Sequence, residues 1–409
     1  MRSSTRPRQV REALLYLALP LSLLFVTSLR FGFVGPLSSL WSAAFLAITA
    51  VCWLGDPVVP SRLRGFVVFY GLFLAWGWGS LLWAGLNTVA LQNLVIFTGF
   101  YCGLLCFSGG AATLLARSSR VASVISITSA TVFFGSRLLL GARDGDIFLY
   151  RPYALVTSIL LAWTAAALRF EPAGRGRRLY VIATLSSLAT VVATGSRTAT
   201  AISLVICALV ASIGTDGRLR LGRVTALGVA AVLGFTLLIT RIDVFRERPG
   251  NNVVEVRGVQ INASGRLSMW EQTLQSWGTS PRTRLFGQGA GSVSETMRRN
   301  RPGTGLPGQT LVHPHNEYLR LLHDFGAIGL GLWGCAMASL LVPLLRDTLR
   351  PVGSAGRNLD QPRLLALTAL TVLLAACLFL NPLVYIFVMA PLAIALGIAY
   401  YEPQPRPTP

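Results

Sequence analysis

TVALQNLVIFTGFYCGLLCFS occupies residues 88–108 and contains no charged side chain. About 20 apolar residues in a helix are enough to cross the hydrocarbon core of a bilayer. Similar stretches recur along the 409-residue chain, which is 53% apolar, only 13% charged and has a mean hydropathy of +0.59. Since a soluble protein carries about 25% charged residues, this composition excludes a soluble enzyme, a disordered chain and a nucleic-acid-binding domain.

Twelve apolar segments are separated by charged residues or by proline and glycine. We expect membrane-spanning helices at residues 13–32, 36–54, 65–86, 88–108, 121–140, 152–168, 179–195, 198–213, 222–240, 326–345, 363–380 and 384–401. The sequence therefore predicts an all-α polytopic membrane protein. It divides into nine helices (1–240), a large polar loop (241–325), and three further helices with a short tail (326–409).

The distribution of arginine predicts the orientation of these helices. All 36 basic residues are arginine, which gives a net charge of +20. With twelve spans both termini lie on one side, where the tails and short loops hold twenty arginines, against four in the opposite short loops. Because short cytoplasmic loops are enriched in basic residues, we expect both termini in the cytoplasm and the 241–325 loop outside it.

All three histidines of the chain lie at the end of this loop, in HPHNEYLRLLHDFGAIGLGLWG at residues 313–334. A His-x-His pair can chelate a metal, but a convincing third ligand and the HExxH pattern are both absent from the sequence. We therefore rank a metal site below acid–base chemistry. The alternative for His323, and equally for His313, is a polar residue without a chemical role.

His315 is the candidate general base. Asn316 is a suitable N-cap and Glu317 an acidic first-turn residue, so the pattern predicts a helix that begins at about residue 317. Pro314 then keeps His313 out of helical geometry and leaves His315 in the turn before the helix. We expect the helix dipole there to disfavour an imidazolium and to keep the ring neutral, as a base requires.

Glu317, Arg320 and Asp324 follow on one face of this helix. Their spacing of three and four residues is typical of ion pairs along a helix. The simplest interpretation is an ion-pair ladder on the polar first turns, before the apolar span begins.

Three arginines outside the histidine segment are candidate functional residues, and arginines of the polar loop suit an anionic ligand because a guanidinium matches phosphate oxygens with two parallel hydrogen bonds. Arg197 lies in TGSRTA (194–199), which we expect to form an outer hairpin. Arg266 lies in SGRLSMWEQTL (264–274), which we expect to start a helix. Arg137 lies within a predicted span, where a charge suggests function. The alternative is that such arginines extend to lipid headgroups.

His315-Asn316, nine further residues and then Gly326-Ala327-Ile328-Gly329 together resemble a motif at the end of the large loop of the O-antigen ligase and polymerase superfamily. Arg197 and Arg266 are similar to that family's two arginines, and LFGQGAG (285–291), which we expect to be a glycine turn, is similar to its members. The resemblance implies a fold like that of metal-independent GT-C-type glycosyltransferases.

The resemblance implies a bacterial enzyme of the inner (cytoplasmic) membrane with an extracytoplasmic active site. It would transfer a glycan from undecaprenyl diphosphate to a glycan, lipid or protein acceptor, without metal, cofactor or nucleic acid. His315 would be the catalytic base and Arg197 and Arg266 would hold the diphosphate. Supporting residues would be His313, Asn316, Glu317, Arg320 and Arg137. A repeat-unit polymerase is the alternative within the family, and a lipid-linked sugar transporter or flippase is the alternative from another class.

Overall fold

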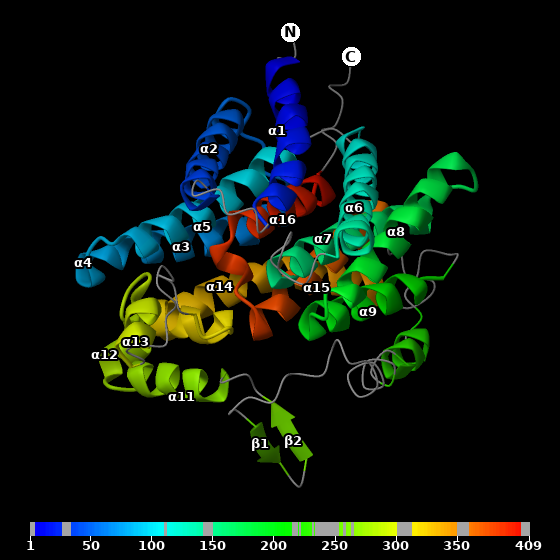
Figure 1. Ribbon diagram of the computed structural model, residues 1–409. Coiled ribbons are helices and arrows are strands. Elements are labelled where there is room, and N and C mark those ends of the chain that lie inside the picture. The colour runs from blue at the N-terminus through cyan, green and yellow to red at the C-terminus, as the bar shows by residue number, and fades with distance from the viewer. Residues whose placement is uncertain are drawn as a thin grey trace.

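The computed structural model describes residues 5–26, 34–109, 113–141, 150–214, 220, 222–230, 233, 253–256, 259–262, 266–300, 313–349 and 360–401. Within these residues the chain is a bundle of long helices, and a group of short helices lies against one of them, α14 (Figure 1).

The long helices are α1 (Thr5–Leu24), α2 (Val34–Leu54), α3 (Arg64–Gly79), α5 (Thr88–Ser108), α6 (Thr113–Leu140), α7 (Tyr150–Phe170), α8 (Arg175–Ala193), α9 (Arg197–Ala211), α14 (Glu317–Leu349), α15 (Gln361–Phe379) and α16 (Ile386–Ala399). The short helical elements are η1 (Ser61–Leu63), α4 (Leu81–Ala84), α11 (Arg266–Trp277), α12 (Pro281–Phe286), α13 (Ser292–Asn300) and η3 (Pro382–Val384). Two short strands, β1 (Val253–Val256) and β2 (Val259–Asn262), pair antiparallel with Val253 opposite Asn262.

Seven helical stretches among the described residues are long and apolar enough to cross a membrane. They comprise α2, the stretch from η1 to α4, α5, α6, α7, α14 and α15. Helices α9 and α16 are apolar but shorter. The prediction of a polytopic helical membrane protein is therefore confirmed. The predicted ninth span, 222–240, falls mostly outside the described residues, of which 222–230 are helical.

The first helix extends further toward the N-terminus than the predicted span, because charged residues continue a helix where they are bonded or buried. Helix α1 begins at Thr5 instead of residue 13, and Arg11 within it is buried, with Nη1 donating to the carbonyl of Gly109 at 3.0 Å. Helix α14 begins at Glu317, as the cap at Asn316 predicts, and continues into the span predicted from residue 326. The predicted large loop, 241–325, thus contains helices of its own, α11 to α13, and the first turns of α14.

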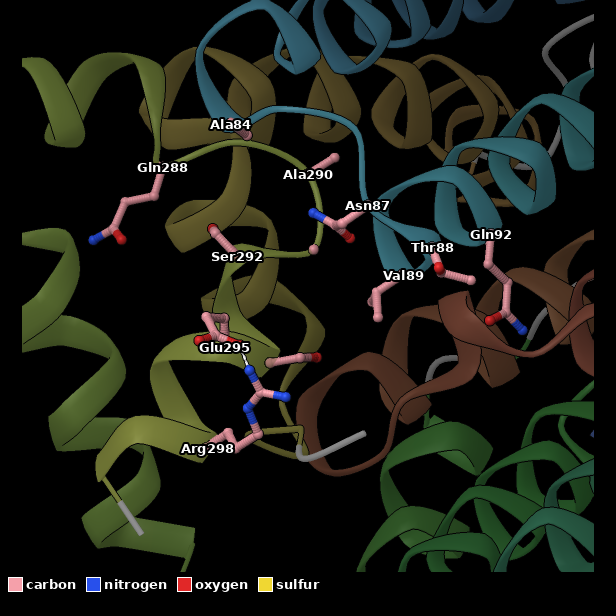
Figure 2. Close-up of a pocket in the computed structure, with 12 residues that line it drawn as sticks. Ala84, Asn87, Thr88, Val89, Gln92, Gln288, Ala290, Ser292, Glu295 and Arg298 are labelled. Carbon is pink, nitrogen blue, oxygen red and sulfur yellow. Dashed lines mark hydrogen bonds and ion pairs between the residues drawn. The ribbon is translucent and has the colours of Figure 1, made fainter. Parts of the chain in front are cut away.

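The backbone of α14 departs from helical geometry at Gly326, where φ is 69° and ψ is −172°. The reason is a close backbone contact with the turn between α12 and α13, residues 287–291, which we call the glycine turn. A Cβ atom on Gly326 would lie 2.2 Å from the carbonyl oxygen of Leu285 and 2.6 Å from the amide nitrogen of Gly287. The glycine turn also contacts the segment between α4 and α5, near Ala84 (Figure 2). The prediction of a turn here is confirmed, since Gly287, Gly289 and Gly291 all have positive φ.

Gly326→Ala is expected to lower the free energy of unfolding by at least about 2 kcal/mol, because alanine is strained at positive φ and its Cβ would meet backbone atoms. Gly331→Ala in the same helix is the matched control. A Cβ there meets no atom within 4 Å, and alanine favours a helix by about 1 kcal/mol over glycine. Denaturant titration in mixed micelles measures both, and equal stability of the two variants would contradict the role of Gly326.

Helices α7 and α9 lie side by side and run in the same direction. Ala154 and Ala199 share one buried cluster, the hydroxyls of Ser158 and Ser203 are 3.1 Å apart, and Arg169 donates to the carbonyl of Ile213 at 3.1 Å. Successive residues of α7 thus meet successive residues of α9. The first turns of the two helices therefore lie level with each other at one end of the bundle.

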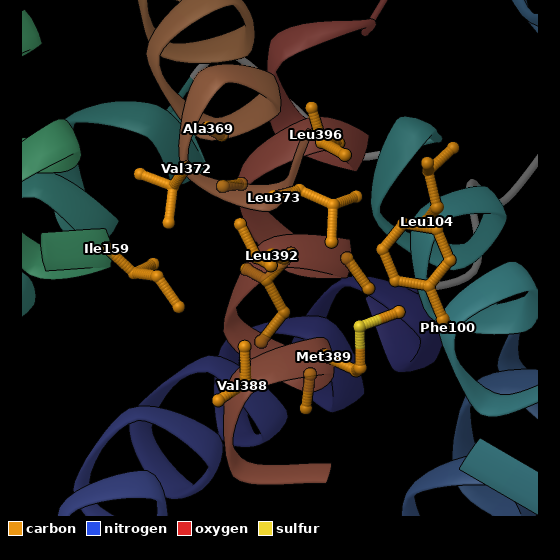
Figure 3. Packing of buried hydrophobic residues seen from close by; sticks show 14 of the residues in the cluster. Phe100, Leu104, Ile159, Ala369, Val372, Leu373, Val388, Met389, Leu392 and Leu396 are labelled. Carbon is orange, nitrogen blue, oxygen red and sulfur yellow. The ribbon is translucent and has the colours of Figure 1, made fainter. Parts of the chain in front are cut away.

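Helix α16 is the centre of the bundle. Every residue from Ile386 to Ile398 is buried, and the helix packs against α5, α15 and α1. Figure 3 shows Met389 and Leu392 of α16 among side chains of α5, α7 and α15, such as Phe100 and Leu373. Exposed apolar side chains, such as Val51 and Leu185, lie on the peripheral helices α2 and α8, as expected for surfaces that contact lipid.

Candidate active site

The predicted helix start at His315-Asn316 is confirmed. Helix α14 begins at Glu317, and the Oδ1 atom of Asn316 accepts a hydrogen bond from the amide of Leu319 at 3.1 Å. His315 precedes this cap with φ 53°, the left-handed region that non-glycine residues seldom adopt. Trp270 of α11 holds the same turn, since its indole nitrogen donates to the carbonyl of Pro314 at 2.8 Å. His315 is thus fixed between two helices.

The surroundings of His315 keep its imidazole neutral. Its pKa is lowered from 6.5 to about 4, first by burial and then by the positive charges of Arg151 and Arg266. The direction of this shift is the one expected from the sequence, but its causes are burial and two nearby positive charges and not the helix dipole. Two guanidinium groups and the removal of water together disfavour a second positive charge.

Asn381, between α15 and η3, is the hydrogen-bond partner of His315. The Nδ2 atom of Asn381 lies 3.3 Å from Nδ1 of the imidazole. Asn381 is only 4% exposed, and its Oδ1 atom is buried with no hydrogen-bond partner among the described residues. A rotation of this amide by 180° would bring Oδ1 to the same imidazole nitrogen.

Arg266 is the first residue of α11 and Arg197 is the first residue of α9. The positive charge of Arg266 contributes to the lowered pKa of His315. Arg197 is not among the charges that act on the imidazole. It nevertheless begins α9 level with the first turn of α7, where Arg151 lies, so Arg197 and Arg151 belong to the same end of the bundle. The hairpin predicted at TGSRTA is confirmed between α8 and α9.

Glu317 and Arg320 form a buried ion pair in the first turns of α14. Their side chains are 0% and 1% exposed, and the guanidinium lies over the ring of Phe97 at 5.4 Å. Both Nη atoms of Arg320 lack a hydrogen-bond partner among the described residues, and Oε1 of Glu317 accepts from the amide of Leu383 at 3.3 Å. The prediction of a ladder on a polar face is wrong, because η3 and α5 cover this face.

Asp324 does not join Glu317 and Arg320 in the predicted row of ion pairs. Its carboxylate accepts hydrogen bonds from the amides of Gly291 at 3.1 Å and Val293 at 2.9 Å. These donors belong to the start of α13, whose first amides have no partner within their own helix. His323 is fully buried beside Asp324 and lies 3.2 Å from the hydroxyls of Ser292 and Ser276. Both residues thus join the short helices to α14.

Two of the predicted supporting residues, His313 and Arg137, take no part in the hydrogen bond between His315 and Asn381. His313 is buried, and its pKa is lowered to about 3 by burial first and then by Arg320 and His315. Arg137 donates from Nη1 to the carbonyl of Ala193 at 3.2 Å and lies 4.4 Å over the ring of Phe133. Arg137 thus fastens α6 to the end of α8. Within the described part of the chain, no three His, Cys, Asp or Glu side chains are grouped as metal ligands.

Sequence reasoning missed Arg151 and Asn381 as site residues. Arg151 begins a span next to Pro152, and it is one of only four arginines in the short loops opposite the arginine-rich side. That position is the signal that could have identified it. Asn381 is a polar residue between two apolar segments, followed by Pro382, a pattern that also suits an ordinary turn.

Residues 182–334 match the family model described as O-antigen ligase. The match includes Arg197, Arg266 and His315 and ends before Asn381. None of the curated proteins matches the chain.

Proposed function

The chain is a member of the O-antigen ligase superfamily, and from that premise we propose that it transfers a glycan from undecaprenyl diphosphate to an acceptor hydroxyl, with His315 as the base. Membership implies a glycosyltransferase-like ligase or polymerase whose partners are a lipid-linked glycan and an acceptor in the membrane. The observation that carries the finer proposal is a half-buried imidazole, held between α11 and α14, whose pKa is lowered by burial and by the positive charges of Arg151 and Arg266.

In the proposed reaction the acceptor hydroxyl attacks the anomeric carbon of the donor sugar. A new glycosidic C–O bond forms while the C–O bond to the diphosphate breaks, and the leaving diphosphate takes the electron pair. His315 takes the proton of the hydroxyl. Because the attack is in line with the leaving group, the configuration at the anomeric carbon inverts.

Arg266, Arg151 and Arg197 would oppose the negative charge that grows on the diphosphate. Fixed positive groups in a dehydrated site stabilise such charge strongly, because they need no reorganisation during the reaction. Arg266 begins α11, and the other two begin the adjacent helices α7 and α9. We therefore add Arg151 to the diphosphate-binding pair expected from the sequence. The reaction as proposed needs no metal, and the site would face the outside of the cytoplasmic membrane.

The role of a base constrains which nitrogen of His315 carries the proton. With Nδ2 of Asn381 against Nδ1, that nitrogen accepts a hydrogen bond, so the proton of the neutral ring lies on Nε2. With the amide rotated, Oδ1 of Asn381 accepts from Nδ1–H, and the lone pair of Nε2 is available to the substrate. We propose the second arrangement for the active enzyme, which makes Asn381 a positioning residue.

Asn381→Leu is expected to lower kcat on the order of 10²-fold, because the imidazole loses the acceptor that fixes its tautomer. Asn381→Asp keeps an acceptor at this place and adds negative charge, so it should restore most of the activity and raise the pKa of His315. The pH dependence of kcat/KM measures that shift. If Asn381 served packing alone, the leucine variant, which is similar in size, would keep most of the wild-type kcat.

The activity should persist at acidic pH. Since the pKa of His315 is about 4, the imidazole is neutral and able to accept a proton at every pH above that value. We expect kcat/KM, which reports the free enzyme, to fall to half near pH 4. Arg151→Gln removes one of the two positive charges that act on the imidazole. The pH at which kcat/KM is half-maximal should therefore rise toward the ordinary histidine pKa of about 6.5. A wild-type midpoint near 6.5 would contradict this site.

Transfer by the purified protein in lipid nanodiscs tests the proposed function. The substrates are undecaprenyl-diphosphate oligosaccharide and an extract of the acceptor lipids of the host cell. A ligase attaches one glycan to each acceptor, whereas a polymerase produces a ladder of repeat units. Turnover should survive EDTA and fall in Arg266→Lys and Arg197→Lys, which keep the charge but lose the planar fork. Movement of intact lipid-linked glycan between leaflets, without transfer, would indicate a transporter instead.

A further inference from the structure

A second candidate site is a cavity of about 650 Å³ beside the glycine turn, distinct from the turn that carries His315. Its walls are the start of α5, the glycine turn and α13 (Figure 2). A volume of this size is typical of cavities that bind organic ligands, which range from about 300 to 1,000 Å³. The cavity is therefore large enough for a sugar substrate.

The walls of this cavity are fixed to the long helices. The amide of Ala290 donates to the hydroxyl of Ser80 at 3.0 Å, and the amide of Gly291 donates to Asp324 at 3.1 Å. On the opposite wall, Oδ1 of Asn87 accepts from the amide of Ala90 at 2.8 Å and caps α5. The polar groups here are thus held in place before any ligand binds, which lowers the entropy lost on binding.

The polar groups that line the cavity have unused hydrogen-bonding capacity. Ser294 is only 6% exposed, yet its hydroxyl has no hydrogen-bond partner among the described residues. The Nδ2 atom of Asn87 likewise has none within the described part of the chain, since the cap uses Oδ1. Thr88 and Gln92 continue along the same wall (Figure 2). Because a buried hydroxyl without a partner is costly, Ser294 points to a ligand that supplies one.

The charges of the cavity indicate a ligand without large net charge. Glu295 and Arg298 are the charged lining residues, and they form an ion pair with each other. The walls therefore combine amides and hydroxyls with a neutral pair. Such groups donate to and accept from sugar hydroxyls, whereas a diphosphate is better matched by guanidinium groups such as those of Arg151 and Arg266, whose charges act on His315. The lining therefore fits a saccharide better than a lipid phosphate.

The cavity lies near the proposed catalytic turn. Helix α5, whose first residues line the cavity, packs against η3, which follows directly after Asn381, the partner of His315. The amide of Leu383 in η3 also donates to Glu317 at the start of α14. The short element η3 thus contacts helices that belong to both sites.

We propose that this cavity binds the saccharide portion of one of the two substrates, the donor glycan or the acceptor. The proposal rests on the proposed transfer function, because that function supplies the sugar. It assigns Gln92, Thr88 and Ser294 to sugar hydroxyls and leaves the chemistry to the site around His315.

Binding can be measured apart from transfer. The probe is the oligosaccharide released by mild acid from the lipid-linked glycans of the host cell, and saturation-transfer NMR on full-length protein measures its Kd. The double variant Gln92→Leu with Ser294→Ala should raise the Kd at least about tenfold, because two hydrogen bonds are lost. Arg282→Ala is the matched control. Its side chain is exposed on α12 and does not line the cavity, so its Kd should equal that of the wild type.

Steady-state kinetics then identify which substrate provides the sugar. A tenfold higher KM for the lipid-linked donor in the double variant assigns the cavity to the donor glycan, and a tenfold higher KM for the acceptor assigns it to the acceptor. Thr88→Val, at an exposed position, replaces the double variant if that variant does not fold, and should raise the Kd about threefold. Absence of saturable binding to the wild type, or a variant Kd equal to that of the wild type, overturns the proposal. Binding by a wild type that performs no transfer supports the cavity and refutes the proposed function.

Discussion

His315→Gln is expected to lower kcat for glycan transfer by about 10²- to 10⁴-fold, the usual contribution of a general base. Glutamine is similar in length and polarity to histidine but cannot accept the proton of the attacking hydroxyl. The positive charges of Arg151 and Arg266 remain in this variant, so the KM for the lipid-linked donor should change little. Product formation in nanodiscs, followed with a fluorescent acceptor, measures both constants.

The matched control for His315→Gln is Arg299→Ala, which alters an exposed side chain of the same polar segment. It should retain wild-type kcat. A loss of less than tenfold in His315→Gln would remove the base from the mechanism and leave the arginines as the main catalytic groups. A loss confined to KM would make His315 a substrate-binding residue.

The second large effect concerns stability. Glu317→Leu should lower the free energy of unfolding by about 3–5 kcal/mol, because the guanidinium of Arg320 would remain buried without the carboxylate that pairs with it. The two Nη atoms of Arg320 already lack hydrogen-bond partners among the described residues. The site cannot compensate by hydration, because both side chains are almost completely buried. Unfolding in mixed micelles with increasing dodecyl sulfate measures this change.

The double variant Glu317→Leu with Arg320→Met separates the charge effect from packing. An apolar pair of similar volume often replaces a buried ion pair at little cost, so the double variant should recover most of the stability lost in Glu317→Leu. If both variants were equally unstable, shape at this position and not the unpaired charge would explain the loss.

Much of the fold follows from hydropathy and from local capping residues. Thr88–Ser108 forms a helix with the predicted limits because Asn87 caps its start and no charge interrupts it. The hairpin at Arg197 and the start of α14 after Asn316 were likewise predictable, since a helix terminus depends on a few adjacent residues. These signals are local in the chain.

The site depends on contacts that no local pattern contains. Asn381 contacts His315 although the two residues are 66 positions apart in the sequence. Arg151, whose charge lowers the pKa of the same imidazole, is still further away along the chain. Asp324 is spaced like an ion-pair partner of Arg320, yet it binds the start of α13. Tertiary packing decides which of two chemically reasonable partners a side chain contacts. For that reason the position of the candidate base before a helix was predictable and its surroundings were not.

The attachment of the glycine turn to α14 has a consequence for hydrogen exchange. The amides of Gln288 and Gly289 donate to the carbonyls of His323 and Asp324, and those of Gly291 and Val293 donate to the Asp324 carboxylate. A loop amide usually exchanges its proton for deuterium quickly, whereas one bonded to a stable helix must wait for that helix to open. Deuterium uptake between residues 288 and 293 therefore reports how often the first turns of α14 separate from the loop.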